Sequence, residues 1–178
     1  MSGLHGKPAV VHGRRIGYDP GMKPRVYLET TISSYLTAWT SRDLVMAAHQ
    51  QVTREWWDSR RADFDLFVSQ LVLQEAAAGD PDAAARRMES LREIPVLGLS
   101  EAAADLAQEL VRRVPLPERA ALDALHIGIA TVNGMDYLLT WNCKHIANAT
   151  YQPRIGLVCR DQGYESPVIC TPEELMEG

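Results

Sequence analysis

The chain of 178 residues lacks the features that mark several specialised classes of protein. No apolar run approaches the roughly 20 residues that a membrane-spanning helix needs, and the N-terminus has no apolar core of a secretory signal. Internal repeats and low-complexity tracts are also absent. We therefore expect a cytoplasmic protein. The length suits a single domain with one sizeable core.

Cysteines are few, and the common catalytic motifs are missing. Cys143, Cys159 and Cys170 are odd in number and widely spaced, which fits neither a disulfide framework nor paired zinc ligands, so we expect buried or idle thiols. The run Cys143-Lys144-His145 has no second ligand pair to complete a zinc site. The sequence contains no glycine-rich loop for ATP and no motif of a nucleophilic serine or cysteine.

The basic excess of a typical nucleic-acid-binding protein is missing too, since the net charge is −5. An acidic body can still bind RNA if metal ions neutralise its acidic cleft and basic groups surround it. The first 25 residues do carry more basic than acidic groups: Lys7, Arg14, Arg15, Lys23 and Arg25 against Asp19. Such an arm could contact phosphates, although charged chain ends often have no such role.

Residues 1–24 are rich in glycine and proline and show no periodic pattern, which predicts an irregular N-terminal extension before a domain over residues 25–178. Within that domain, short apolar runs predict buried strands. These runs span residues 25–29, 64–68, 137–140 and 168–170. Ile94–Leu97 should form a short edge segment, because Pro95 disfavours a central strand.

Helical patterns alternate with these strands. The predicted helices cover residues 30–38 (capped by Thr30 or Thr31), 44–56, 70–78, 80–91, 100–114 and 118–132, with a short helix directly after Asn142 and a last helix start at 171–174. Buried strands that alternate with helices favour a parallel sheet with right-handed crossovers. The predicted fold is a three-layer α/β/α domain with a central, mostly parallel sheet.

Two acidic residues lie where a functional site is expected in this fold. Glu29 ends the first strand, and ligands of open parallel sheets bind beyond the carboxyl ends of the strands. Glu75 shares a helix face with Leu71 and Val72, a face that should pack on the sheet, where an isolated charge is costly. The alternatives are a solvated strand end for Glu29 and a structural salt bridge for Glu75.

Asp123 is the strongest candidate, because it lies in an almost wholly apolar helix. Between Ala120 and Val132 the only other polar side chains are those of His126 and Thr131, and aspartate is a poor helix former. We expect His126 to be a hydrogen-bonded core histidine rather than a catalytic base. Asn142 follows a strand at its carboxyl end, where it could ligate a metal, orient a metal-bound water or cap the next helix.

Carboxylates gathered in a place of low dielectric repel one another unless a cation compensates them. Hard divalent ions such as Mg²⁺ and Mn²⁺ accept oxygen ligands, polarise phosphate oxygens and generate hydroxide from bound water. Glu29, Glu75, Asp123 and Asn142 are therefore the predicted metal-binding and catalytic residues. Phosphodiester hydrolysis is the natural chemistry of such a site.

Four segments together resemble the PIN-domain family, which includes the VapC-type toxins of toxin–antitoxin pairs. They are Val26–Thr31, the helix with Glu75, Ala121–His126 and Leu138–Asn142. The resemblance extends from about Arg25 to the C-terminus. It implies a metal-dependent endoribonuclease that acts on RNA, forms a homodimer and is neutralised by a small antitoxin.

Two positions depart from the family pattern. The family usually has aspartate where this chain has Glu29, whose extra methylene moves the carboxylate by about 1.5 Å, and its fourth position is often acidic where Asn142 is neutral. These departures favour one rival, a degenerate PIN-like module that acts through RNA or protein contacts. A phosphatase or phosphotransfer domain would need a nucleophilic aspartate at the first strand end, and a DNA nuclease would carry more acids and extra DNA-binding elements.

Overall fold

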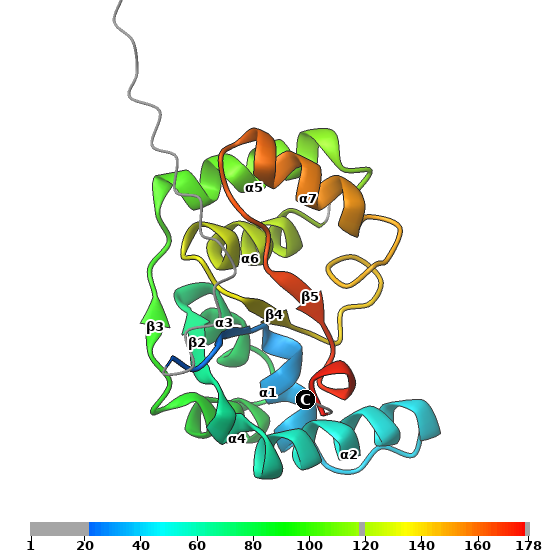
Figure 1. The fold of residues 1–178 in the computed structure, drawn as a ribbon. Helices are drawn as coiled ribbons and strands as arrows, with labels where there is room; N and C mark the ends of the chain where they lie inside the picture. Colours follow the sequence, from blue (N-terminus) through cyan, green and yellow to red (C-terminus); the bar gives the residue numbers. More distant parts are fainter. Residues whose placement is uncertain (1–21, 118–119, 177–178) are drawn as a thin grey trace, which may run out of the picture.

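Short apolar runs form the strands of one central sheet in the computed structural model, which describes residues 22–117 and 120–176 (Figure 1). The strands are β1 (Arg25–Leu28), β2 (Asp65–Ser69), β3 (Val96–Leu97), β4 (Tyr137–Leu139) and β5 (Val168–Cys170). They lie in the order β3-β2-β1-β4-β5, and every pairing is parallel. The two-residue strand β3 is at the edge, as the proline before it predicts.

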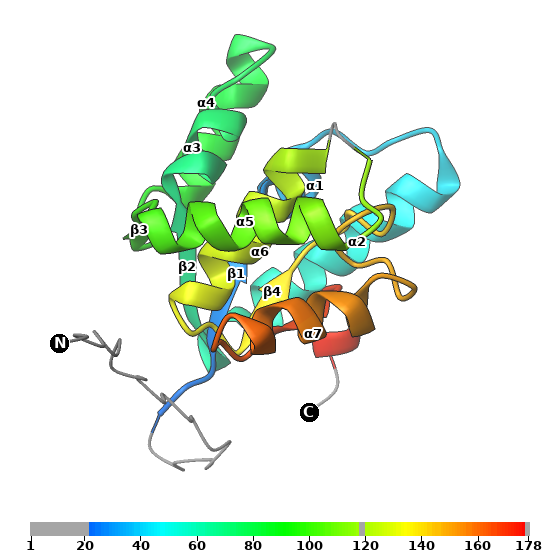
Figure 2. The same cartoon turned by 90° about the horizontal axis from the view of Figure 1, so that it is seen from above.

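Helices cover both faces of the sheet, which confirms the three-layer α/β/α fold. They are α1 (Thr30–Thr37), α2 (Leu44–Ser59), α3 (Gln70–Ala76), α4 (Pro81–Leu91), α5 (Glu101–Arg113), α6 (Ala121–Val132) and α7 (Gln152–Asp161), with short 3-10 turns at Arg61–Asp63 and Glu173–Leu175. Helices α5, α6 and α7 lie on one side of the sheet, and α2 and α4 lie on the other (Figures 1 and 2). Among the described residues, no helix has the length and apolar character that a bilayer crossing requires.

Local sequence signals set most helix starts. The side chains of Ser69, Asp80 and Ser100 each accept a hydrogen bond from the backbone N–H three residues further along the chain. Such caps stabilise a helix by about 1 kcal/mol each. The predicted start of α6 at Glu118 and nearly all of the predicted extension over residues 1–24 lie outside the described residues.

The predicted helix directly after Asn142 is wrong. Residues 143–147 form turns instead, and the next helix, α7, begins ten positions after Asn142 at Gln152. The Asn142 side chain does act as a cap, accepting from the backbone N–H of His145 at 3.1 Å. The backbone N–H of Ala147 donates to the carbonyl of Asn142 at 2.9 Å, which closes a turn over five residues in place of the four-residue span of an α-helix.

The three cysteines have no disulfide partners, as predicted. Cys143 is exposed, whereas Cys159 and Cys170 are buried. Burial, together with the nearby charge of Glu174, raises the pKa of the Cys170 thiol to about 12. Cys170 is therefore a neutral, unreactive part of the core.

The strand order places the ends of β1 and β4 side by side, at the point where the order of strand addition reverses. From β1 the chain adds β2 and β3 on one side, and then returns to add β4 and β5 on the other. Ligand sites of open α/β sheets form at such a switch point, beyond the carboxyl ends of the strands. Here the backbone N–H of Glu29 donates to the carbonyl of Leu139 at 3.0 Å, so the residues that follow β1 and β4 must meet.

Helix α6 is held at a fixed depth by a close approach to α5. A Cβ atom added at Gly128 would lie 2.5 Å from the backbone oxygen of Ala103, a distance that real side chains do not adopt. Glycine therefore lets the two helix backbones nearly touch. The same helix carries Asp123 and His126, so this contact sets how far those side chains reach towards the strand ends.

We predict that Gly128→Ala lowers the free energy of unfolding by about 1–3 kcal/mol, because overpacking forces one helix away from the other. Gly156→Ala is the matched control, since Gly156 lies inside α7 and a Cβ there would meet nothing within 4 Å. This second change should stabilise the protein by about 0.5–1 kcal/mol through helix propensity. Urea denaturation of both variants is the measurement, and equal stabilities would contradict the close approach.

Candidate metal centre

Glu29 is held rigidly at the end of β1. Its side chain is only 6% exposed. One carboxylate oxygen, Oε2, accepts hydrogen bonds from the hydroxyls of Thr31 at 2.5 Å and Thr140 at 2.6 Å, and from the backbone N–H of Thr31 at 3.2 Å. Glu29 is thus the N-cap of α1, and the predicted cap at Thr30 or Thr31 is wrong. A negative charge there also meets the favourable end of the helix dipole.

Glu75 reaches the same edge from α3. Its Oε2 accepts from the Thr30 hydroxyl and lies 3.0 Å from Nε2 of His126. Burial alone would raise the pKa of Glu75, but the hydrogen bonds from His126 and Thr30 outweigh it and hold that pKa below its ordinary value. Glu75 is therefore a carboxylate at neutral pH.

His126 is the hydrogen-bonded core histidine that the sequence predicts. It is 1% exposed, and its Nδ1 lies 2.8 Å from the hydroxyl of Tyr27, which in turn lies 2.7 Å from the hydroxyl of Ser69. Burial is the main cause of a strongly raised pKa for Tyr27, so the phenol keeps its proton. No sequence motif points to Tyr27, although a hydroxyl in an apolar strand is a signal that a buried partner must exist.

Asp123 and Asn142 form the opposite side of the cluster. The side-chain amide of Asn142 donates to Oδ1 of Asp123 at 2.9 Å, while its carbonyl oxygen accepts from the His145 backbone. Burial raises the pKa of Asp123, and the charges of Glu29 and Glu75 add to the increase, whereas the nearby His145 and His126 oppose it. The protein thus disfavours the charge on Asp123 and favours that on Glu75.

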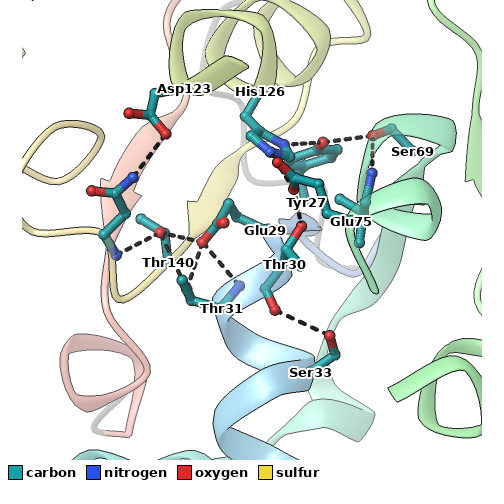
Figure 3. Close-up of polar contacts among 12 residues, drawn as sticks. Tyr27, Glu29, Thr30, Thr31, Ser33, Ser69, Glu75, Asp123, His126 and Thr140 are labelled. Atoms are coloured by element: carbon teal, nitrogen blue, oxygen red, sulfur yellow. Dashed lines mark hydrogen bonds and ion pairs between the residues drawn. The ribbon is translucent and has the colours of Figure 1, made fainter. Parts of the chain in front are cut away.

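Glu29, Glu75 and Asp123 converge from one strand end and two helices (Figure 3), and Asn142 joins them through its hydrogen bond to Asp123. Glu29, Glu75 and His126 offer ligand atoms that all lie within 4.8 Å of one another, whereas Asp123 lies outside this close group. In Glu29, Glu75 and Asp123 alike, the described residues donate hydrogen bonds to only one carboxylate oxygen. Each second oxygen is thus left to bind something else, and three such oxygens suit a hard divalent cation.

The opposite pKa shifts predict opposite effects on stability in the metal-free protein. Asp123→Asn should raise the free energy of unfolding at pH 7, because it removes a charge that burial and neighbouring carboxylates disfavour. Glu75→Gln should lower it, because it removes a charge that His126 and Thr30 stabilise.

Both differences should fade in acid. The penalty at Asp123 exists above its raised folded pKa and disappears as pH falls towards the ordinary value of 3.8. The contribution of Glu75 is complete above the ordinary value of 4.5 and is lost as pH falls through its lowered folded pKa. Denaturant titrations of both variants and wild type from pH 3 to 8 provide the test, and differences that do not change with pH would refute this electrostatic account.

Comparison with known proteins supports the fold. No protein-family profile matches the sequence, and no curated protein matches it either. Among solved structures, the chain is similar to the sarcin–ricin loop cleaving toxin VapC20 of Mycobacterium tuberculosis. The TM-score is 0.54 at 17% identity, over 71% of this chain and 95% of that one.

The chain is also similar to a chain of VapBC2 from Rickettsia felis, a structure bound to a DNA fragment from their promoter. Here the TM-score is 0.53 at 14% identity, over 83% of this chain and 98% of that one. At such identities the likeness shows the fold alone. The fold is that of the VapC toxins, which confirms the PIN-like architecture predicted from the sequence.

Proposed function

We propose that the protein is a metal-dependent endoribonuclease of the VapC toxin type. Its metal would be Mg²⁺ or Mn²⁺, held by Glu29, Glu75 and Asp123, and its reaction the hydrolysis of RNA phosphodiester bonds. The observation that carries the proposal is the meeting of three carboxylates at the switch point of the sheet, each with one oxygen that accepts nothing from the described residues. The shared fold with a sarcin–ricin loop cleaving toxin supports RNA as the substrate.

A divalent ion at this site would supply a Lewis acid for the phosphate and a water of lowered pKa. The residues of the chain contribute preorganisation. The Thr30 hydroxyl fixes one oxygen of Glu75, and the Thr31 and Thr140 hydroxyls fix one oxygen of Glu29. Both carboxylates are therefore already oriented before an ion would bind. Asn142 does the same for Asp123 with its amide, and in this arrangement it orients a ligand rather than acting as one.

The proposal extends to partners. The structural relative from Rickettsia felis is part of a VapBC2 assembly, which supports a small antitoxin as the partner of this chain, beside RNA and a second copy of the chain itself. Light scattering during size-exclusion chromatography would measure the size of the free protein, for which we propose a homodimer.

Removing a single site charge tests the proposed activity. Asp123→Asn and Glu75→Gln should each reduce cleavage of a mixed RNA pool by at least about 100-fold, because a metal contributes several kcal/mol to such a reaction. Mn²⁺ should raise the melting temperature of wild type but not of either variant, since a ligand that binds only the native state stabilises it. Glu55→Gln, an exposed change on α2, is the control that should behave like wild type.

The rival function is a degenerate module that binds RNA or protein without cutting. It makes a distinct prediction, because a degenerate site has no metal binding that depends on its carboxylates. Calorimetry with Mn²⁺ would then give no heat of binding for wild type, or the same heat for wild type and for Glu75→Gln. Either result would overturn the endoribonuclease proposal and leave the fold assignment intact.

Glu29 gives a sharper prediction about the metal. Its longer side chain places the carboxylate farther from the strand than an aspartate would, and Mg²⁺ demands near-ideal octahedral geometry at roughly 2.0–2.1 Å. We expect wild type to be more active with Mn²⁺ than with Mg²⁺, and Glu29→Asp to retain activity while changing that preference. Glu29→Gln should be nearly inactive. If it cuts RNA as fast as wild type with both ions, Glu29 is only the cap of α1.

A further inference from the structure

We infer that His126 and Tyr27 are positioning residues, which hold one oxygen of Glu75 and leave the other for the cation, and that His126 is not itself a metal ligand. The inference rests on the proposed metal site and deepens it. The geometry alone is ambiguous, because 3.0 Å between Nε2 of His126 and Oε2 of Glu75 suits either a hydrogen bond or two adjacent ligands of one ion. Where the protons lie distinguishes the two.

Ser69, at the end of this series of hydrogen bonds that is farthest from Glu75, sets their direction. This residue is fully buried, and its oxygen accepts from the backbone N–H of Val72 at 3.3 Å. Among the described residues, the only acceptor for the Ser69 hydroxyl proton is the oxygen of Tyr27 at 2.7 Å. A buried hydroxyl rarely leaves its proton unpaired, so Ser69 donates to Tyr27.

The remaining protons follow from that first donation. Tyr27 receives a bond from Ser69, so its own proton points to Nδ1 of His126 at 2.8 Å. Nδ1 is then an acceptor, and the neutral ring carries its proton on Nε2. This N–H faces Glu75 and donates to Oε2. Ser69 thus donates to Tyr27, Tyr27 to His126 and His126 to Glu75, so every proton in this series has an acceptor.

The ligand alternative reverses the whole series. A metal on Nε2 requires the proton on Nδ1, which would have to donate to Tyr27. Tyr27 would then donate to Ser69, and the Ser69 proton would have no acceptor among the described residues. The unpaired hydroxyl proton would lie in the core, where no water could accept it, because Tyr27 and Ser69 are both 0% exposed. The arrangement therefore favours a donor at position 126 over a ligand.

The consequence for the site is a fixed Glu75. Its Oε2 accepts from both His126 and Thr30, two donors on different helices, so the carboxylate cannot rotate without losing one of them. Partners of this kind typically change metal affinity or activity by about 10–100-fold when they are removed. The role is thus measurable as metal affinity.

Variants at position 126 separate a donor from a ligand. His126→Gln keeps an N–H donor near the place of Nε2, and it should bind Mn²⁺ within about threefold of wild type by calorimetry. His126→Leu should lose about 10–100-fold in affinity, and Tyr27→Phe about tenfold, because the ring then no longer has a fixed tautomer. Thr131→Val is the matched control, since it removes another buried hydroxyl from α6 outside this series, and its Mn²⁺ affinity should equal that of wild type.

Pulsed electron paramagnetic resonance of the Mn²⁺-loaded protein provides a second test. We expect no histidine nitrogen coupled to the ion. A nitrogen coupling that is lost in His126→Gln, or unchanged Mn²⁺ affinity in Tyr27→Phe and His126→Leu, would overturn the positioning role while leaving the metal site in place. Wild type that binds no Mn²⁺ at all would instead refute the proposed function, and the positioning role with it.

Discussion

The pairing of β1 with β4 is the constraint on which the site depends. Glu29 and Thr140 lie 111 positions apart in the chain, yet their side chains share a hydrogen bond of 2.6 Å because both follow the carboxyl ends of neighbouring parallel strands. Helices α3 and α6 then only have to bring one acidic side chain each to that edge. The tight contact of Gly128 with Ala103 meets this need for α6, since it fixes the depth at which the helix packs.

Electrostatics shows what this convergence costs. Three carboxylates gather beside a core, and the protein can stabilise only some of their charges by its own donors. Glu75 has the donors, and its pKa is lowered, whereas the raised pKa of Asp123 shows that burial and its neighbours disfavour its charge. A cation bound beside these groups would offset the repulsion that disfavours the charge on Asp123.

The sequence predicts the parts of the molecule that depend on periodicity and on short-range signals. Strands and most helix starts follow from patterns within a few residues, and the structure agrees with them. The acidic candidates follow from such patterns too, and their role stays a prediction. The hydrogen bonds of Tyr27 do not follow from such patterns, because they join residues 42 and 99 positions away. The turn after Asn142 is hard to predict for a different reason, since an asparagine that accepts from the backbone three residues on can begin either a helix or a turn.

The two departures from the family pattern acquire a physical meaning in this structure. Glu29 caps α1 and accepts from Thr140 with the same oxygen, so one carboxylate joins the start of the helix to the end of β4. Asn142 donates its amide N–H to Asp123, which a carboxylate at that position could not do. A fourth acid would add to the repulsion that already raises the pKa of Asp123. A neutral amide instead fixes Asp123 and adds no charge. The site would therefore attract a cation less strongly than four acids would, but its ligand groups are held more rigidly.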